Sequence, residues 1–188
     1  MSSSALLLTP HPRPRRSTSP WTTVFAMSAL ALCVATATSS IWARRTLLIN
    51  ATASEPLGLY ARVGGGAAAG RIVAFDAPAA AFPYADHHLG YLHRVPMLKT
   101  IAGVAGDQIC TLTGRLVING HDLAPIIAAD KEGRALPHWA SCRALEGGEV
   151  FVFSARVPNS FDSRYFGPVP TASILGVYAP LLTLGKAR

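Results

Sequence analysis

The chain has 188 residues, enough for one compact domain with an appendage but too few for two ordinary domains. Half of its residues are hydrophobic, only 14% are charged, and its formal net charge is +7. The basic residues are scattered and are not clustered with aromatic side chains, so no nucleic-acid partner is expected. The composition instead favours a protein that lies partly in or against a membrane.

An uncharged apolar segment follows a polar leader at the N-terminus. Residues 1–20 are rich in Ser, Pro and Arg and are expected to be disordered, whereas residues 21–43 carry no charge. The apolar segment just reaches the roughly 20 residues that a membrane-spanning helix needs, and the arginines before it favour an N-inside orientation. We expect 21–43 to be a transmembrane anchor. A cleaved signal peptide is the alternative, because Ala35-Thr36-Ala37 could serve as a small-residue cleavage site.

Residues 46–188, which are exported in either case, show short extended runs separated by turn signals. The runs expected to be strands are Gly58–Arg62, Arg71–Phe75, Met97–Ala102, Gln108–Leu112, Arg115–Ile118, Val150–Ser154 and Ile174–Tyr178. Asn119-Gly120 is a strong hairpin signal, and 77–90 reads as a loop or a short helix. Because no helical periodicity extends far beyond the apolar segment, the sequence predicts a mostly β domain of curled antiparallel sheets.

Histidines and cysteines of the exported part raise the question of metal binding and cross-linking. His87, His88 and His93 are close in sequence, but no carboxylate or cysteine stands at a convincing ligand spacing, so neither a metal site nor a cofactor is expected. Cys110 and Cys142 lie where oxidation is allowed, and a single disulfide between them is one hypothesis. The sequence leaves the paired and the unpaired state open.

Two polar residues suit nucleophilic catalysis. Ser54 precedes Pro56 and Gly58, and such constrained backbone can hold a side chain out of a sheet. Lys99 lies in an apolar strand pattern, and desolvation lowers the pKa of a lysine that points inward. Its neutral amine can then take the proton of a serine hydroxyl. If Lys99 points outward, it is an ordinary solvated lysine.

A third polar segment, 159–169, alternates polar residues with aromatic ones. Ser160 and Asp162 would share one face of this segment if it were extended. The alternative is an ordinary surface loop with an exposed Asp–Arg pair, worth about 0.2–1 kcal/mol.

In their order along the chain, these segments resemble the motifs of the signal peptidase clan. Lys99 runs into Gly103–Asp107, which has the Gly-x-x-Gly-Asp form of the lysine box. Ser160–Gly167 has the late-box form Ser-x-Asp-Ser-Arg-Tyr-aromatic-Gly. The Ser-x-Pro-x-Gly-Leu-Tyr form of 54–60, together with Leu136–Arg143, resembles the TraF-type peptidases of conjugative plasmid transfer.

The chain departs from general signal peptidases at two places. Glu55 stands where they have Met after the serine, so their substrate-side packing and membrane association do not carry over. Ser154-Ala155-Arg156 replaces the Gly-Asp-Asn pattern that opens their late box.

The resemblance implies a signal-peptidase-like fold and a set of catalytic roles. The catalytic residues would be Ser54 as nucleophile, Lys99 as general base and Asp162, which braces the site as an ion pair. Supporting residues, which orient the lysine amine, complete the ion pair or donate to an oxyanion, would be Thr52, Ser160 and Arg164.

The resemblance further implies a serine endopeptidase anchored in the bacterial inner membrane, with its catalytic domain facing the periplasm. Its partners would be a pilin or another exported precursor, membrane lipid and the conjugative transfer (type IV secretion) machinery. Water would release an acyl-enzyme as a linear product, and the substrate's own amino terminus would release it as a cyclic one; the sequence leaves both open. Two rival functions are a general type I signal peptidase that removes leader peptides and a non-enzymatic anchored β domain of a secretion assembly.

Overall fold

The structure is a computed structural model that describes residues 21, 24–25, 27–29, 46–82 and 84–184. The chain divides into two units, Met1–Trp42 and Ala43–Arg188. Within the described ranges, no helix is both long enough and apolar enough to cross a membrane. The expected leader, most of the expected anchor and the last four residues of the expected peptidase domain lie outside these ranges.

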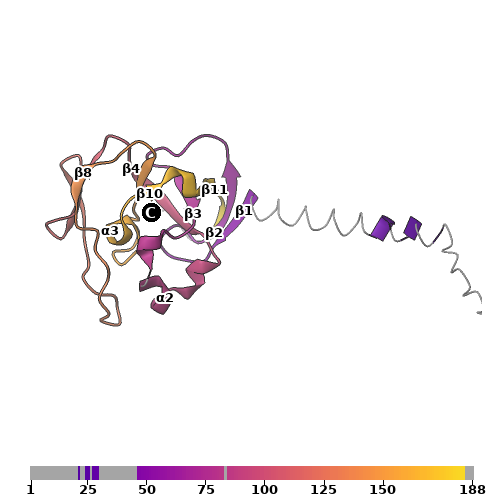
Figure 1. Cartoon of the computed structure of the whole chain (residues 1–188), viewed down its shortest axis with the longest axis horizontal. Helices are drawn as coiled ribbons and strands as arrows, with labels where there is room; N and C mark the ends of the chain where they lie inside the picture. The colour runs from indigo at the N-terminus through magenta and orange to yellow at the C-terminus, as the bar shows by residue number, and fades with distance from the viewer. Residues whose placement is uncertain (1–20, 22–23, 26, 30–45, 83, 185–188) are drawn as a thin grey trace, which may run out of the picture. The chain divides into compact units, whose positions relative to one another are not determined.

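The second unit contains two antiparallel sheets (Figure 1). The larger has the strand order β1-β2-β11-β3-β4-β9-β10 and the smaller the order β7-β6-β5-β8. The strands are β1 Leu47–Asn50, β2 Gly58–Val63, β3 Ile72–Phe75, β4 Met97–Val104, β5 Gln108–Cys110, β6 Arg115–Ile118, β7 His121–Pro125, β8 Cys142–Ala144, β9 Glu149–Val152, β10 Val169–Pro170 and β11 Ile174–Thr183. The helical turns are η1 Ala79–Ala81, α2 Tyr84–His88, η2 Gly90–His93, α3 Ser163–Phe166 and η3 Thr171–Ser173.

The mostly β, curled antiparallel architecture expected from the sequence is confirmed for the described residues of 46–188. Each predicted strand is present, with end points that differ by a few residues, and 77–90 forms short helical turns. Asn119 (φ 51°) and Gly120 (φ 81°) form the tight turn between β6 and β7. Both residues have positive φ, as the turn type that suits a two-residue hairpin requires.

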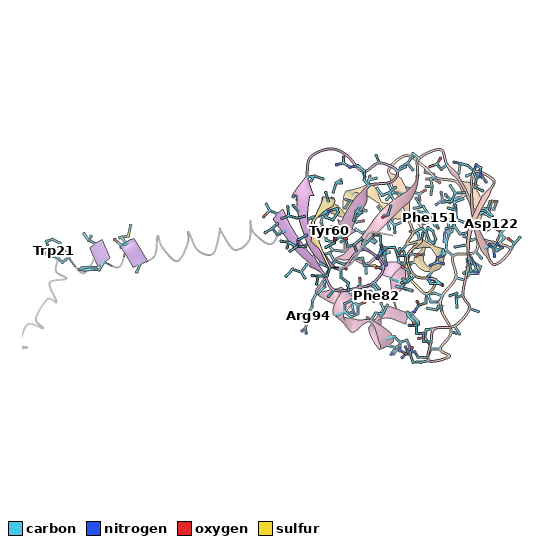
Figure 2. The ribbon with its side chains drawn as sticks, turned by 180° about the vertical axis from the view of Figure 1, so that it is seen from behind. Trp21, Tyr60, Phe82, Arg94, Asp122 and Phe151 are labelled. Atoms are coloured by element: carbon cyan, nitrogen blue, oxygen red, sulfur yellow. A yellow bond between two sulfur atoms is a disulfide. The ribbon has the colours of Figure 1, made fainter. Side chains whose placement is uncertain are left out.

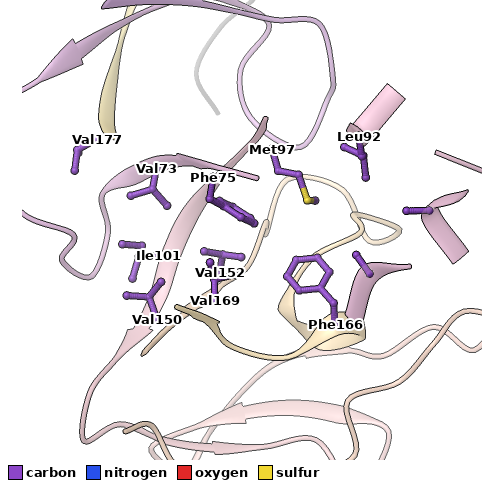
Figure 3. Close-up of a cluster of buried hydrophobic side chains, with 12 residues drawn as sticks. Val73, Phe75, Leu92, Met97, Ile101, Val150, Val152, Phe166, Val169 and Val177 are labelled. Atoms are coloured by element: carbon purple, nitrogen blue, oxygen red, sulfur yellow. The ribbon is translucent and has the colours of Figure 1, made fainter. Parts of the chain in front are cut away.

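The main core lies on one face of the larger sheet. Alternate residues of the central strands β3, β4 and β9 point into it, among them Val73, Phe75, Ile101 and Val152, as Figure 3 shows. A second cluster, which includes Phe151 and Phe153 from β9 and its end, packs against the smaller sheet. β9 therefore joins the two sheets through the opposite faces of a single strand.

The two sheets occupy different sides of the unit. Figure 2 shows Tyr60 of β2 at one end, Asp122 of β7 at the other and Phe151 of β9 between them. The candidate site residues lie on the turn after β1, whose Pro56 carbonyl oxygen accepts a hydrogen bond from the Tyr60 hydroxyl, and at the start of β4.

Candidate active site

A cavity of about 550 Å³ contains the sequence-predicted nucleophile and base. Ser54, Thr52, Lys99 and Ser160 all line it. Most of its other walls are apolar and come from β1, from the segment that leads into β4 and from the loop before α3: Leu48, Ile49, Leu89, Leu92, Val95, Met97, Leu98, Val157 and Phe161. The chain therefore brings together residues from three distant segments around a mostly apolar space.

The turn after β1 that carries Ser54, the nucleophile turn (residues 51–57), is held by Asn50. The Asn50 side-chain amide nitrogen donates to the carbonyl oxygens of Thr52 (2.9 Å), Glu55 (2.9 Å) and Pro56 (3.0 Å). Its amide oxygen accepts from the Thr52 backbone N–H at 3.1 Å. One buried side chain thus fixes several backbone groups of the turn, which keeps the Ser54 side chain in place.

Ser54 is buried, and its hydroxyl lies against Thr52. The two oxygens, Ser54 Oγ and Thr52 Oγ1, are 3.2 Å apart, and Thr52 Oγ1 also donates to Asn50 Oδ1 at 2.9 Å. The Ser54 carbonyl oxygen accepts a hydrogen bond from the Ser154 hydroxyl. Within the described residues the Ser54 backbone N–H has no acceptor, so it is free to donate to a ligand in the cavity.

Lys99 points into the domain, which decides the alternative that the sequence left open. It lies on the same face of β4 as Met97 and Ile101, both members of the main core. Only 5% of Lys99 is exposed, and its Nζ donates to Ser160 Oγ at 2.8 Å. Desolvation lowers the pKa of Lys99 from 10.5 to about 8, although Asp162 and Glu55 oppose this shift.

Ser54 and Lys99 both line the cavity, and their side chains are not hydrogen-bonded to each other. Lys99 Nζ bonds to Ser160, and Ser54 Oγ contacts Thr52. Catalytic hydrogen bonds often tighten only in the complex with substrate, so the two side chains can still act as a nucleophile and its base.

Asp162 and Arg164 form a fully buried ion pair beneath the cavity. Arg164 Nε donates to Asp162 Oδ1 at 2.8 Å and its Nη2 to Oδ2 at 3.0 Å. Arg164 Nη2 also donates to the Ser160 carbonyl oxygen at 3.0 Å, and Nη1 reaches the Pro125 carbonyl oxygen at 2.9 Å. The pair thereby holds the backbone of Ser160, whose hydroxyl bonds Lys99.

Asp162 is thus placed as a positioning group. Besides the Arg164 side chain, its carboxylate accepts from the backbone N–H groups of Ser154 and Arg164, each at 3.3 Å. The second of these bonds caps the N-terminus of α3. The carboxylate does not bond Lys99 directly, and it acts on the lysine through its charge and through Ser160.

Sequence reasoning missed three buried residues that belong to the site: Asn50, Glu55 as a structural member, and Ser154. Asn50 could have been recognised from the sequence, because an asparagine at the end of a strand is a common turn residue. Ser154 has no such signal, because it meets the nucleophile turn from 100 residues away. It stands in the segment where the chain departs from the late-box opening, and it nevertheless contacts Ser54.

The cysteines and histidines lie outside this arrangement. Cys110 of β5 and Cys142 of β8 are directly opposite each other and are joined in a disulfide. His93 Nε2 lies 2.6 Å from Asp86 Oδ1 at an exposed position. The described ranges contain no group of three or more possible metal ligands.

Comparisons with known proteins show the family to which the chain belongs. A family model for signal peptidase, peptidase S26, matches residues 20–182, so the chain belongs to the peptidase S26 signal peptidase family. The chain is also 32% identical to the conjugal transfer protein TraF of Agrobacterium fabrum, over 72% of its own length and 81% of that protein. It is 32% identical to the plasmid transfer protein TraF of Escherichia coli, over 72% and 82% of the two chains.

The chain is also similar to a third TraF protein and to one solved structure. A probable conjugal transfer protein TraF of Sinorhizobium fredii is 31% identical, with 72% of this chain and 76% of that protein covered. A crystal structure of a signal peptidase I from Enterococcus faecalis is 25% identical, covers 61% of this chain and 98% of its own, and superposes with a TM-score of 0.38. The resemblance to TraF-type proteins that the motifs predict is therefore confirmed at the level of the family.

Proposed function

We propose that this protein is a membrane-tethered serine endopeptidase that matures the precursor of a conjugative pilin. The observation that carries the proposal is Lys99, a buried lysine held by the Ser160 hydroxyl in the same cavity as Ser54. A lysine in this setting is a suitable general base, because its pKa of about 8 leaves part of it neutral near physiological pH.

The reaction starts with attack of Ser54 Oγ on the scissile carbonyl carbon. The Oγ–H proton passes to Lys99 Nζ, and the carbonyl oxygen becomes an oxyanion. The C–N bond then breaks, the leaving amine takes the proton from Lys99, and an ester remains on Ser54. The backbone N–H of Ser54 is one proposed oxyanion donor. The Thr52 hydroxyl is the other, with its proton turning from Asn50 Oδ1 to the oxyanion. Each such donor is worth about 2.7–4 kcal/mol by analogy with other acyl-transfer sites.

The acyl-enzyme has two possible acceptors. When Lys99 takes a proton from water, the water oxygen attacks the ester carbon. The bond from that carbon to Ser54 Oγ then breaks, a linear product with a carboxyl terminus leaves, and Lys99 returns the proton to Ser54 Oγ. Lys99 can equally take a proton from the substrate's own amino terminus, which yields an amide bond and a cyclic product. The TraF names of the relatives support a conjugative pilin precursor as the substrate, and either product is compatible with it.

Exposed apolar side chains support a position at a membrane surface. Ile49 of β1 is 81% exposed, and the end of β11 and the residue after it expose Leu181 (64%), Leu182 (65%) and Leu184 (72%). β1 and β11 both pair with β2, so these side chains belong to the same part of the sheet. β1 also follows the uncharged segment 21–43 closely in sequence, which fits an inner-membrane anchor and a periplasmic domain.

The test is precursor processing by the full chain in bacterial cells. Ser54→Ala, Lys99→Ala and Lys99→Arg are each co-expressed with a conjugative pilin precursor and, separately, with an exported precursor that carries a general leader peptide. The arginine variant keeps the charge but cannot act as a base. The matched control is Ser173→Ala, which removes a serine hydroxyl that does not line the cavity.

The proposal predicts that all three site variants stop pilin processing and that the control processes normally. Intact-mass spectrometry of the product decides its form, because a cyclic product is one water lighter than the linear one. Normal processing in Ser54→Ala and Lys99→Ala would overturn the proposal and favour a non-enzymatic β domain of a secretion assembly. Efficient cleavage of the general precursor would favour the type I signal peptidase instead.

A further inference from the structure

Glu55, directly after the proposed nucleophile, is a buried carboxylate with no role in the chemistry above. It is 5% exposed, and its Oε1 accepts a hydrogen bond from Thr100 Oγ1 at 2.8 Å. Burying a carboxylate without a purpose is costly, since its desolvation must be offset by hydrogen bonds and opposite charge. Burial does raise the pKa of Glu55, while Thr100, Lys99 and Arg156 oppose that rise.

The positions of Glu55 and Ser54 relative to β4 give the carboxylate a function. Successive strand residues point to opposite faces, so Lys99 and Thr100 face opposite sides of β4. Ser54 lines the cavity on the Lys99 side, whereas Glu55 bonds Thr100. Glu55 therefore bonds one residue of β4, and Ser54 shares the cavity with the neighbouring residue of that strand, Lys99.

We propose that Glu55 is a positioning residue for the Ser54–Lys99 pair. Its carboxylate fastens the nucleophile turn to Thr100 and so fixes the distance between the nucleophile and the base. Its negative charge also stabilises the Lys99 ammonium that forms when the Ser54 proton is transferred. This inference rests on the proposed peptidase function and adds to it a residue that general signal peptidases replace by Met.

In the described part of the domain, few charged groups act on Lys99 and Glu55. Those that act on Lys99 are Asp162 and Glu55, which raise its pKa, and Arg164, which lowers it. Besides Lys99, Glu55 interacts with Arg156 and with the Tyr60 hydroxyl, whose pKa is raised to about 12 and which therefore stays neutral. Among the described residues, removal of the Glu55 charge leaves Asp162 as the anionic group that raises the pKa of Lys99.

Two substitutions separate the hydrogen bond from the charge. Glu55→Gln removes the charge and keeps an oxygen that can accept from Thr100. Thr100→Val removes the hydroxyl and keeps the charge and the approximate side-chain shape. Both are made in the full chain in detergent micelles, and thermal unfolding identifies any variant that has lost its fold.

The first measurement does not depend on peptidase activity. The chain has three lysines, at positions 99, 131 and 186, so lysine labelled with ¹³C at Cε gives three NMR signals, and Lys99→Arg assigns the one of interest. We expect Glu55→Gln to lower the pKa of Lys99 by about one unit, because an anion is lost near the ammonium. Thr100→Val should leave that pKa close to the wild-type value.

The second measurement is the pH profile of pilin-precursor cleavage. In Glu55→Gln the rise of kcat/KM should move to lower pH with the Lys99 pKa, and the plateau kcat should fall because the amine is a weaker base. In Thr100→Val the midpoint should stay and kcat should fall at least about tenfold, since small misplacements of reacting groups are costly. A Lys99 titration unchanged by Glu55→Gln, or a wild-type kcat in Thr100→Val, overturns the proposal.

The two hypotheses fail in different ways. If the chain is no peptidase, Ser54→Ala changes no processing, yet the NMR titration still reports whether Glu55 acts on Lys99. If the chain is a peptidase and Glu55 is only structural, Ser54→Ala abolishes processing and Glu55→Gln leaves the titration unchanged.

Discussion

Lys99 is held by a neutral hydroxyl and surrounded by apolar side chains of the main core. Burial favours the neutral amine, because desolvation penalises the charged form. Asp162 and Glu55 limit the effect, so the lysine keeps a pKa near 8 and can still accept a proton. The balance between burial and two carboxylates is what makes the residue a usable base.

The pH dependence of activity follows from this pKa. The neutral amine is the reactive form, so kcat/KM should be low at pH 6, rise through a midpoint near 8 and level off above it. Initial rates of precursor cleavage between pH 6 and pH 10 measure the midpoint. A profile that is flat across this range, or that falls as pH rises through 8, would show that Lys99 is not the base.

The buried ion pair gives a prediction about stability. Asp162→Asn leaves the fully buried Arg164 guanidinium without its charge partner, which typically costs about 3–5 kcal/mol. Chemical denaturation of the full chain should show this loss, and a double variant with Arg164→Met should recover part of it. If Asp162→Asn is as stable as wild type, the Arg164 charge does not depend on Asp162 for its compensation and the prediction is wrong.

At the scale of elements, the residues that surround Ser54 explain the form of its motif. β2 begins at Gly58, which pairs with Asn50 of β1 on one side and Thr183 of β11 on the other. A Cβ at Gly58 would lie 2.0 Å from the backbone carbonyl oxygen of Leu182, and φ there is +149°. The glycine therefore allows β11 to approach the end of the nucleophile turn closely.

Gly58→Ala should consequently disturb both the sheet and the turn. The methyl group meets backbone rather than a flexible side chain, so either β2 or β11 has to move. We expect a lower melting temperature together with a fall in kcat of at least about tenfold, because the nucleophile turn moves with β2. Gly66→Ala, at a position where an added Cβ meets nothing, is the matched control and should behave like wild type.

How far the sequence predicts each element depends on whether its signal is local. Ser54, Lys99 and 160–167 are found because each lies in a short, characteristic motif. β7 was not predicted, because its residues are mostly exposed and it ends in a proline. β8 has three residues and no alternation that a sequence pattern could reveal, and it is held as a strand by pairing with β5.

The contacts that build the site are the part that the sequence could not supply. The bond from Ser154 to the Ser54 carbonyl oxygen spans 100 residues, and that from Lys99 to Ser160 spans 61. Likewise, the bond from Glu55 to Thr100 appears only when the turn and β4 are side by side. These contacts arise from the order of strands in the larger sheet, which no short motif encodes.

In the molecule as a whole, the disulfide joins two neighbouring strands of the smaller sheet. Cys110 and Cys142 are separated by 32 residues and join β5 to β8. In the chain-entropy description, closing a loop of this length stabilises the folded state by about 3–4 kcal/mol. This cross-link suits an exported domain, because an oxidising compartment preserves it.

Cys142→Ser should therefore lower the free energy of unfolding by about 3–4 kcal/mol. Reductant should produce a similar loss in the wild-type chain and little further change in the variant. Denaturation curves with and without reductant provide the comparison. If reductant leaves the wild-type curve where it is, the two cysteines do not form the cross-link in solution.

The proposed mechanism requires that Ser54 becomes acylated with Lys99 as its base. Its most direct test is an acid-quenched reaction of the full chain with a pilin precursor, followed by intact mass spectrometry and peptide mapping. We predict a substrate-derived adduct on the peptide that contains Ser54, absent in Ser54→Ala and strongly reduced in Lys99→Arg. Processing that continues in Ser54→Ala, or an adduct that maps to another residue, would contradict it.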